Sequence, residues 1–128
     1  SFTIYVIIYF LYDNIIIVIN MKLNIENKTI DIKIANNFKD RFIGLMGKTN
    51  INYGMLFPKC NAIHTFFMKE AIDVIGLNNN NEILFIIKSL KPNKLFHMEH
   101  NLNDSNILEL PNNSSNNFHI GETIKFEL

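Results

Sequence analysis

The chain has 128 residues, with twelve basic and twelve acidic side chains and a single cysteine. This length suits one domain with one core, and a net charge of zero offers no electrostatic attraction to nucleic acid. One cysteine excludes an intrachain disulfide and any site built from several cysteines of the same chain. Ile, Asn and Lys are abundant while Arg41 is the only arginine, a bias typical of an AT-rich genome.

The first twenty residues are almost wholly apolar, with one aspartate as their only charge. As a helix, residues 2–19 would span about 27 Å, close to the roughly 30 Å of a bilayer core, which suits a membrane anchor. The internal aspartate, the missing basic n-region and the β-branched composition argue against an anchor. Because Met21-Lys22 resembles a translation start, we favour residues 1–20 as translated upstream sequence and residues 21–128 as one globular domain. A start at Met21 predicts a cytoplasmic protein; a genuine anchor predicts a membrane-attached one, with the membrane as a partner.

The domain begins with a predicted hairpin followed by a short helix. Residues 23–34 alternate apolar and polar side chains across a turn at Asn27-Lys28, which predicts a hairpin with one buried face. Apolar residues then recur at helical spacing over residues 38–46. Asn37 fits the cap before this run and Gly47 fits the stop after it, so we expect one short amphipathic helix.

The rest of the chain predicts short strands separated by polar turns. The apolar runs are GMLF, IHTFFM, IDVIGLN, EILFIIKSLKP, NILELP and GETIKFEL. Residues 112–119 are expected to form one turn of helix at most. Many short strands with one or two short helices predict a mainly β, α+β fold, in which mostly antiparallel strands curl into a partly open barrel.

Several separated blocks of the sequence carry a family resemblance. They are RFIGLMGK, GMLF, IHTFFMKEAIDVIGL, LKP, LELP and IGETIKF. In order and spacing they resemble the domain of unknown function 192 family from about residue 30 to the C-terminus. The resemblance implies a compact β-rich domain without an established reaction, cofactor or partner. Two stretches depart from the family pattern. Gly76 replaces a bulky aromatic, which implies an underfilled core position, and NNSSNNFHIGE replaces a small-residue helix and a Gly-Asp turn.

The only cysteine belongs to a run with metal-ligand character. Cys60, His64 and Met68 recur every four residues and carry soft ligand atoms that suit Cu(I), or zinc for the first two. In a helix, neighbours in this set would lie about 5–6 Å apart. Residues 63–68 read instead as a buried strand, where neighbours lie about 13 Å apart. We therefore predict no metal and no cofactor, with Cys60 as a small buried hydrophobe and Met68 as a core filler.

The same geometry predicts no catalytic dyad. A tight turn at Glu70-Ala71 would place His64 and Asp73 on one sheet face but about 13 Å apart along the strand direction. Asp73 would then accept backbone N–H groups of the turn or pair with Lys69, and His64 would bond a backbone carbonyl in the core. The remaining histidines lie in polar loops and are expected at the surface. They are His97, His100 and His119.

A structural ion pair is predicted between Arg41 and Glu109. The planar guanidinium is unique in this lysine-rich chain, which suggests a position that needs its fork. Glu109 lies between Leu108 and Leu110, so it points away from both on a strand. The bridge would tie the helix to the sheet.

The favoured function is a small binding module. The barrel mouth would hold a small molecule or a partner segment, and Lys69 at its rim would favour an anionic group. The residues expected to line it are Cys60, His64, Met68, Lys69 and Asp73. The alternatives are an enzyme that uses His64 or Cys60 in acid–base or thiol chemistry and, if residues 1–20 are real, an accessory protein of a membrane complex. We favour a binding function over an enzymatic one.

Overall fold

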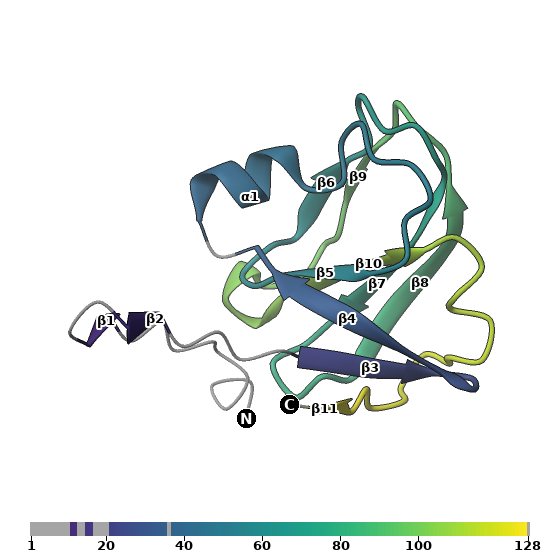
Figure 1. Cartoon of the computed structure of the whole chain (residues 1–128). Helices are drawn as coiled ribbons and strands as arrows, with labels where there is room; N and C mark the ends of the chain where they lie inside the picture. The colour runs from purple at the N-terminus through teal and green to yellow at the C-terminus, as the bar shows by residue number, and fades with distance from the viewer. Residues whose placement is uncertain (1–10, 13–14, 17–20, 36, 128) are drawn as a thin grey trace.

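Figure 1 shows the computed structural model, which describes residues 11–12, 15–16, 21–35 and 37–127. The elements of these residues, in chain order, are β1 Leu11–Tyr12, β2 Ile15–Ile16, β3 Met21–Ile25, β4 Lys28–Ile34, α1 Phe38–Ile43, β5 Gly54–Phe57, β6 Ala62–His64, β7 Ile72–Leu77, β8 Ile83–Leu90, β9 Leu95–His97, the 3₁₀ turn η2 Leu102–Asp104, β10 Asn106–Pro111 and β11 Phe126–Glu127. The expectation for residues 1–20 lies largely outside the described residues. None of the described helices is long and apolar enough to cross a bilayer.

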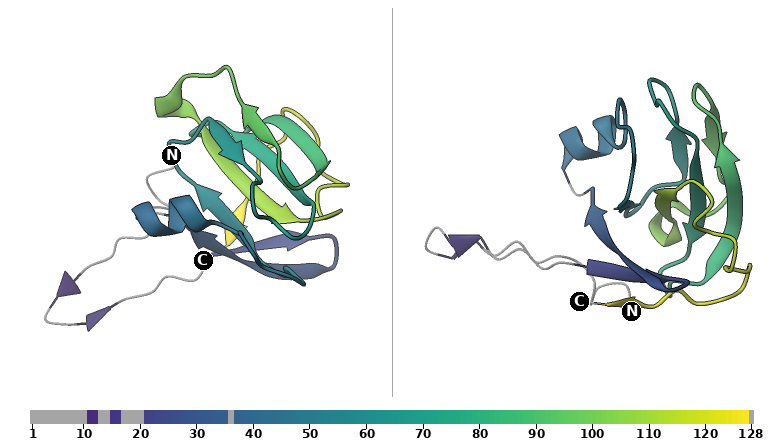
Figure 2. Two further views of the ribbon diagram at one scale, coloured as in Figure 1. Left: turned by 90° about the horizontal axis from the view of Figure 1, so that it is seen from above. Right: turned by 45° about the vertical axis from the view of Figure 1, so that its right-hand side comes forward.

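One seven-stranded mixed sheet forms the framework of the domain. Its strand order is β11-β3-β4-β5-β10-β7-β8, and the β4–β5 pair is parallel while the other neighbours are antiparallel. The sheet curls strongly, as Figures 1 and 2 show, but β8 and β11 remain its edges. The predicted mainly β, α+β class is therefore confirmed, and the sheet is not closed into a barrel.

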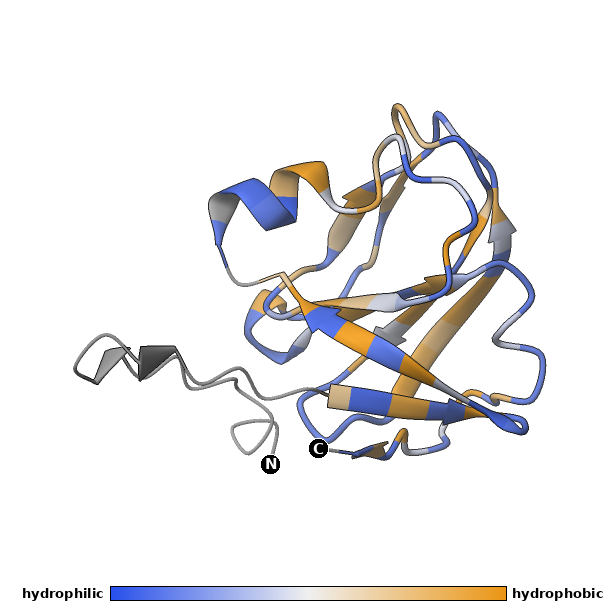
Figure 3. Ribbon diagram, in the orientation of Figure 1, coloured by the Kyte–Doolittle hydropathy of each residue, from blue (hydrophilic) through white to orange (hydrophobic). Residues whose placement is uncertain are grey.

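The central strands bury side chains on both faces. Leu56, Ile75 and Leu108 belong to the core enclosed by the curled sheet. The alternate residues on the same strands, such as Val74 and Ile107, belong to a second core that α1 and the β6–β9 pair cover. Figure 3 shows the corresponding alternation of hydropathy along the outer strands β3 and β4, which bury only one face. The period of two that the sequence shows thus decides which core each residue enters.

The predicted hairpin and helix are both present, with shifted ends. Ile25 pairs with Lys28, so the turn of the β3–β4 hairpin lies at Glu26-Asn27 rather than one residue later. Asn37 caps α1 as expected, because its side chain accepts the N–H of Asp40. The helix ends at Gly44, three residues before the predicted stop, because Gly44 already has a positive φ of +50°.

The predicted strand over residues 63–68 is wrong beyond His64. Strand β6 ends there, and the N–H of Met68 bonds the carbonyl of Thr65 across a tight turn. Strand β6 pairs with β9, which the sequence did not predict, and not with β7. Thr65 explains the early end, because its hydroxyl accepts the N–H of Lys94 and so holds the chain to the loop before β9.

The later strands follow the prediction closely. Strands β7, β8 and β10 occupy the expected apolar runs, and a polar turn precedes β8. Residues 112–117 form successive turns rather than helix, and the closing strand is only Phe126–Glu127. Polar stretches such as these take their shape from side-chain hydrogen bonds, which hydrophobic periodicity does not reveal.

The position of Gly76 is filled, contrary to the expectation of an underfilled core. Gly76 lies opposite Phe85 on β8, and a Cβ built on Gly76 would lie 2.0 Å from the Phe85 ring. The Phe85 ring also packs on Phe96, with centroids 5.0 Å apart. The space expected to be underfilled at Gly76 is thus occupied by the Phe85 ring from the next strand.

Gly76→Ala is therefore expected to destabilise the domain by about 1–3 kcal/mol, because the Phe85 ring must leave a packed position. Urea unfolding followed by circular dichroism measures this loss. The double variant with Phe85→Leu should recover part of it. An unchanged midpoint in Gly76→Ala would contradict this account of the packing.

Candidate functional site

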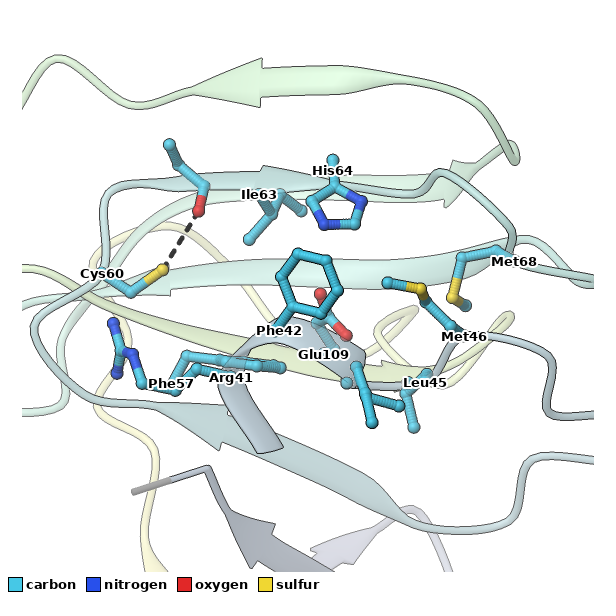
Figure 4. A pocket seen from close by; sticks show the side chains of 13 residues that line it. Arg41, Phe42, Leu45, Met46, Phe57, Cys60, Ile63, His64, Met68 and Glu109 are labelled. Carbon is cyan, nitrogen blue, oxygen red and sulfur yellow. Dashed lines mark hydrogen bonds between the residues drawn. The ribbon is translucent and has the colours of Figure 1, made fainter. Parts of the chain in front are cut away.

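A partly open cavity of about 170 Å³ lies between α1, strand β6 and one face of β10. Apolar side chains make up most of its wall, including Phe42, Leu45, Ile63 and Met68. The polar side chains that line it are Arg41, Cys60, His64 and Glu109 (Figure 4). The lining residues come from three segments of the chain, residues 41–46, residues 57–68 and Glu109, so the cavity is a product of the tertiary fold.

Glu109 is a buried acidic residue in the wall of this cavity. Its strand neighbours Leu108 and Leu110 enter the curled core, so its own side chain projects from the opposite face of β10, as the sequence predicted. It is 5% exposed, and among the described residues no hydrogen bond or ion pair reaches its carboxylate. Burial raises the pKa of Glu109 to about 8, so the carboxyl is neutral below that pH.

The predicted ion pair between Arg41 and Glu109 is not formed. The guanidinium of Arg41 donates instead to the carbonyls of Pro58 and Lys59, at 2.5 and 3.1 Å. These carbonyls follow the end of β5, where a backbone group loses its ladder partner, and the planar fork serves both at once. Arg41 thus ties α1 to the chain after β5 and brings a positive charge to the rim of the cavity.

The Cys60 thiol forms a hydrogen bond within its own segment of the chain. The thiol donates to the carbonyl of Ala62 at 3.1 Å, as Figure 4 shows. Burial, the largest effect, raises the pKa of Cys60, and the charge of Arg41 lowers it to a smaller extent. The half-buried thiol thus lines the cavity as a weak polar group rather than as an activated nucleophile.

His64 and Met68 both line the cavity, but His64 differs from its prediction. Its Nδ1 accepts the N–H of Phe66 at 3.3 Å instead of donating to a carbonyl, and its ring stacks on that of Phe66. An acceptor at Nδ1 places the proton of a neutral ring on Nε2. Met68 is buried in the second core, as the sequence predicted.

Asp73 and Lys69 do not line the cavity. Asp73 is fully buried, and its carboxylate accepts backbone N–H groups of Ser89, Asn113 and Ser115 together with the Ser115 hydroxyl. The expected partners in residues 69–72 are wrong, because β7 and β6 do not form a hairpin. Lys69 is exposed on the turn after β6.

The histidines expected in surface loops are only partly as predicted. His97 and His119 are exposed, but His97 belongs to strand β9 rather than to a loop. His100 is half-buried and its Nε2 lies 3.1 Å from the Asp104 carboxylate. No group of three or more His, Cys, Asp or Glu side chains within the described chain could hold a metal ion. A second hollow of about 320 Å³ lies beside the β3–β4 turn and residues 111–114, and it contains no buried titratable group.

The direction of the Glu109 side chain was predictable from the sequence, but its place in the cavity was not. Its apolar neighbours show that it points away from one core. That it enters a second core depends on the cover made by α1 and β6, which periodicity cannot place. Phe42 is one of the apolar residues that recur at helical spacing over residues 38–46, yet its side chain is 60% exposed and lines the cavity.

The DUF192 family model, described as an uncharacterized ACR, matches residues 19–126. The chain belongs to this family. A UPF0127 protein of Thermococcus sibiricus is 44% identical over 59 residues, which are 41% of this chain and 38% of that protein. One of Pyrococcus furiosus is 43% identical over 61 residues, which are 43% of this chain and 52% of that protein. The similarity to these DUF192-type relatives thus covers about half of their length or less.

A solved structure has a similar fold. The crystal structure of a protein of unknown function from Novosphingobium aromaticivorans aligns with a TM-score of 0.65 over 86% of this chain and 84% of that chain. The two sequences are 15% identical, so the likeness concerns the fold alone. This likeness supports the architecture of the DUF192 domain and carries no information about its chemistry.

Proposed function

We propose that this domain binds a small organic ligand in the cavity beneath α1, with Glu109 as its polar anchor. The observation that carries the proposal is the buried carboxyl group, which has no protein partner among the described residues and lines a cavity open to entry. Buried polar groups are normally hydrogen-bonded, so an unpartnered one beside a cavity suggests a missing partner.

The size of the cavity limits the ligand to a small apolar group. A protein cavity of about 150 Å³ accommodates benzene, and this cavity measures about 170 Å³. The aromatic, aliphatic and thioether side chains of its wall suit one ring or a branched alkyl group. A larger ligand would have to extend past Phe42 into solvent.

The charges around the cavity favour a hydrogen-bond acceptor on the ligand. Glu109 is protonated at neutral pH, so its hydroxyl can donate a hydrogen bond. The guanidinium of Arg41 lines the same cavity and would repel a cationic ligand. A carbonyl oxygen attached to a ring meets both conditions.

Three probes with the same ring test this proposal by protein NMR: acetophenone, ethylbenzene and benzylamine. Acetophenone should shift resonances of cavity residues and bind more tightly than ethylbenzene. It should lose that advantage above pH 8 in the parent but keep it in Glu109→Gln, because the glutamine amide remains a donor at every pH. The exposed Glu82→Gln serves as the matched control and should bind as the parent does. Tighter binding of benzylamine, or an absence of shifts with all three probes, would overturn the proposal.

The second candidate is an enzyme in which Glu109 exchanges a proton with the substrate. The pKa of about 8 favours it, because general acids and bases work best when their pKa lies near the ambient pH.

A thiol enzyme would instead require a reactive Cys60. We expect slow alkylation by iodoacetamide, with a pH midpoint above that of a free cysteine, because burial raises the pKa of this thiol. Fast alkylation at neutral pH would instead support thiol chemistry.

A further inference from the structure

Three loops meet at one end of the molecule. They comprise residues 46–50, 66–70 and 91–94, and both Figure 1 and the right-hand view of Figure 2 show them at the top. Hydrogen bonds join them: the N–H of Gly47 bonds the carbonyl of Phe67, and the hydroxyl of Thr65 bonds the carbonyl of Lys91. We call these three loops, with Leu95 beside them, the loop end.

Large apolar side chains protrude from the loop end. Phe67 is 76% exposed and Leu95 is 74% exposed, while Phe66 is 41% exposed. Phe67 also has a φ of +63°, a region that bulky residues rarely adopt. The turn therefore holds an aromatic ring in solvent in an unfavourable backbone conformation, a combination that marks functional surfaces more often than structural ones.

The loop end carries most of its charge as lysine. Its lysines are exposed, and they are Lys48, Lys69, Lys91 and Lys94. Glu70 is its single acidic residue, and the Glu70 carboxylate is engaged by the N–H of Asn50. Four lysines against one glutamate leave a local charge of +3 in a chain whose net charge is zero. The positive charge therefore belongs to the same three loops that carry the exposed rings.

We infer that the loop end docks on an anionic lipid surface, with Phe67 and Leu95 entering the interface and the surrounding lysines facing lipid headgroups. The charge complements an anionic bilayer, and exposed aromatic side chains with flexible cations are typical of membrane-surface contacts. Cores of protein–protein interfaces are instead depleted in lysine. Phe66 and Phe67 also lie on a tight turn, and Leu95 begins strand β9 beside it. This inference does not depend on what the cavity binds.

The test uses the full chain and two kinds of vesicle, phosphatidylcholine alone and phosphatidylcholine with phosphatidylglycerol. Co-sedimentation should require the anionic lipid and weaken with added salt. Phe67→Asn should reduce partitioning at least about tenfold, because it removes the ring that the lipid interface would bury. Asn tolerates the positive φ, so this variant should keep the fold. Ile120→Asn is the matched control, since Ile120 is 70% exposed outside the loop end, and it should partition as the parent does.

A spectroscopic readout separates the loop end from the apolar residues 1–20, which are also present in the full chain. The chain has no tryptophan, so Phe67→Trp places a single probe at the tip. Its emission should shift to the blue on anionic vesicles and be quenched by spin-labelled lipid, whereas Ile120→Trp should respond to neither. Sedimentation without a response from Phe67→Trp, equal loss in both Asn variants, or no sedimentation at all would overturn the inference.

Discussion

Glu109→Gln is expected to make the domain more stable than its parent at alkaline pH and to remove most of the pH dependence of unfolding. The carboxyl has a pKa of about 8 in the folded chain because of burial, against 4.5 for an unperturbed glutamic acid. Between these two values the folded state holds a proton that the unfolded state has released. The contribution of Glu109 to stability should therefore be greatest below pH 4.5 and fall by about 1.4 kcal/mol per pH unit up to about pH 8.

The glutamine side chain keeps the shape of the protonated acid but cannot ionise. Its buried amide costs about 1–2 kcal/mol where it lacks a partner, so the variant should be somewhat less stable than the parent at pH 5. At pH 9 the parent carries an ionised buried carboxylate, and the variant should be more stable by about 3 kcal/mol.

Guanidinium unfolding at a series of pH values measures both effects. The matched control is Glu82→Gln, which changes an exposed glutamate and should follow the parent curve at every pH. A Glu109→Gln variant that kept the parent's decline towards pH 8 would show that another group causes it.

The second large effect is expected for Asp73→Asn, which should destabilise the domain by about 3–5 kcal/mol. The carboxylate accepts four hydrogen bonds, from the N–H groups of Ser89, Asn113 and Ser115 and from the Ser115 hydroxyl. Oδ1 accepts the N–H groups of Ser89 and Asn113, and Oδ2 accepts both bonds from Ser115. An amide NH₂ group in place of either oxygen would therefore face two donors. Bonds to a charged acceptor that is fully buried are worth more than neutral ones.

Thermal unfolding at neutral pH should show this loss as a fall in Tm of about 10–20 °C. Ser115→Ala removes only the hydroxyl donor and should cost about 1–2 kcal/mol, which gives a measurable outcome even if Asp73→Asn does not fold. The control is Asp31→Asn, because Asp31 is exposed and its nearest cation, Lys22, lies 3.9 Å away. Equal losses in the Asp31 and Asp73 variants would contradict the role given to Asp73.

The predictable parts of the fold are the strands whose positions follow from the pattern of hydrophobic residues. Strands β7, β8 and β10 have long apolar runs bounded by turn residues, so their positions follow from the sequence. The error at residues 63–68 has a physical cause. Phe66 and Phe67 make the run look like a buried strand, but their rings are exposed because Thr65 bonds the chain to another loop.

The candidate site was only half predictable for a similar reason. Cys60, His64 and Met68 were singled out by residue type, and they do line the cavity. Asp73 was added through a hairpin that does not exist, and Glu109 was assigned to an ion pair. Both errors come from long-range pairings, since β10 joins β5 and β7 across large separations in sequence. Local patterns carry no information about such pairings.

The parallel pairing of β4 with β5 has a consequence for how this architecture can diversify. Two parallel neighbours need a crossover segment, and α1 with the loop after it is that segment. The same segment forms one wall of the cavity. Its length and composition can therefore change between homologous proteins while every strand pairing is retained, so selection can reshape what the cavity admits without rebuilding the scaffold.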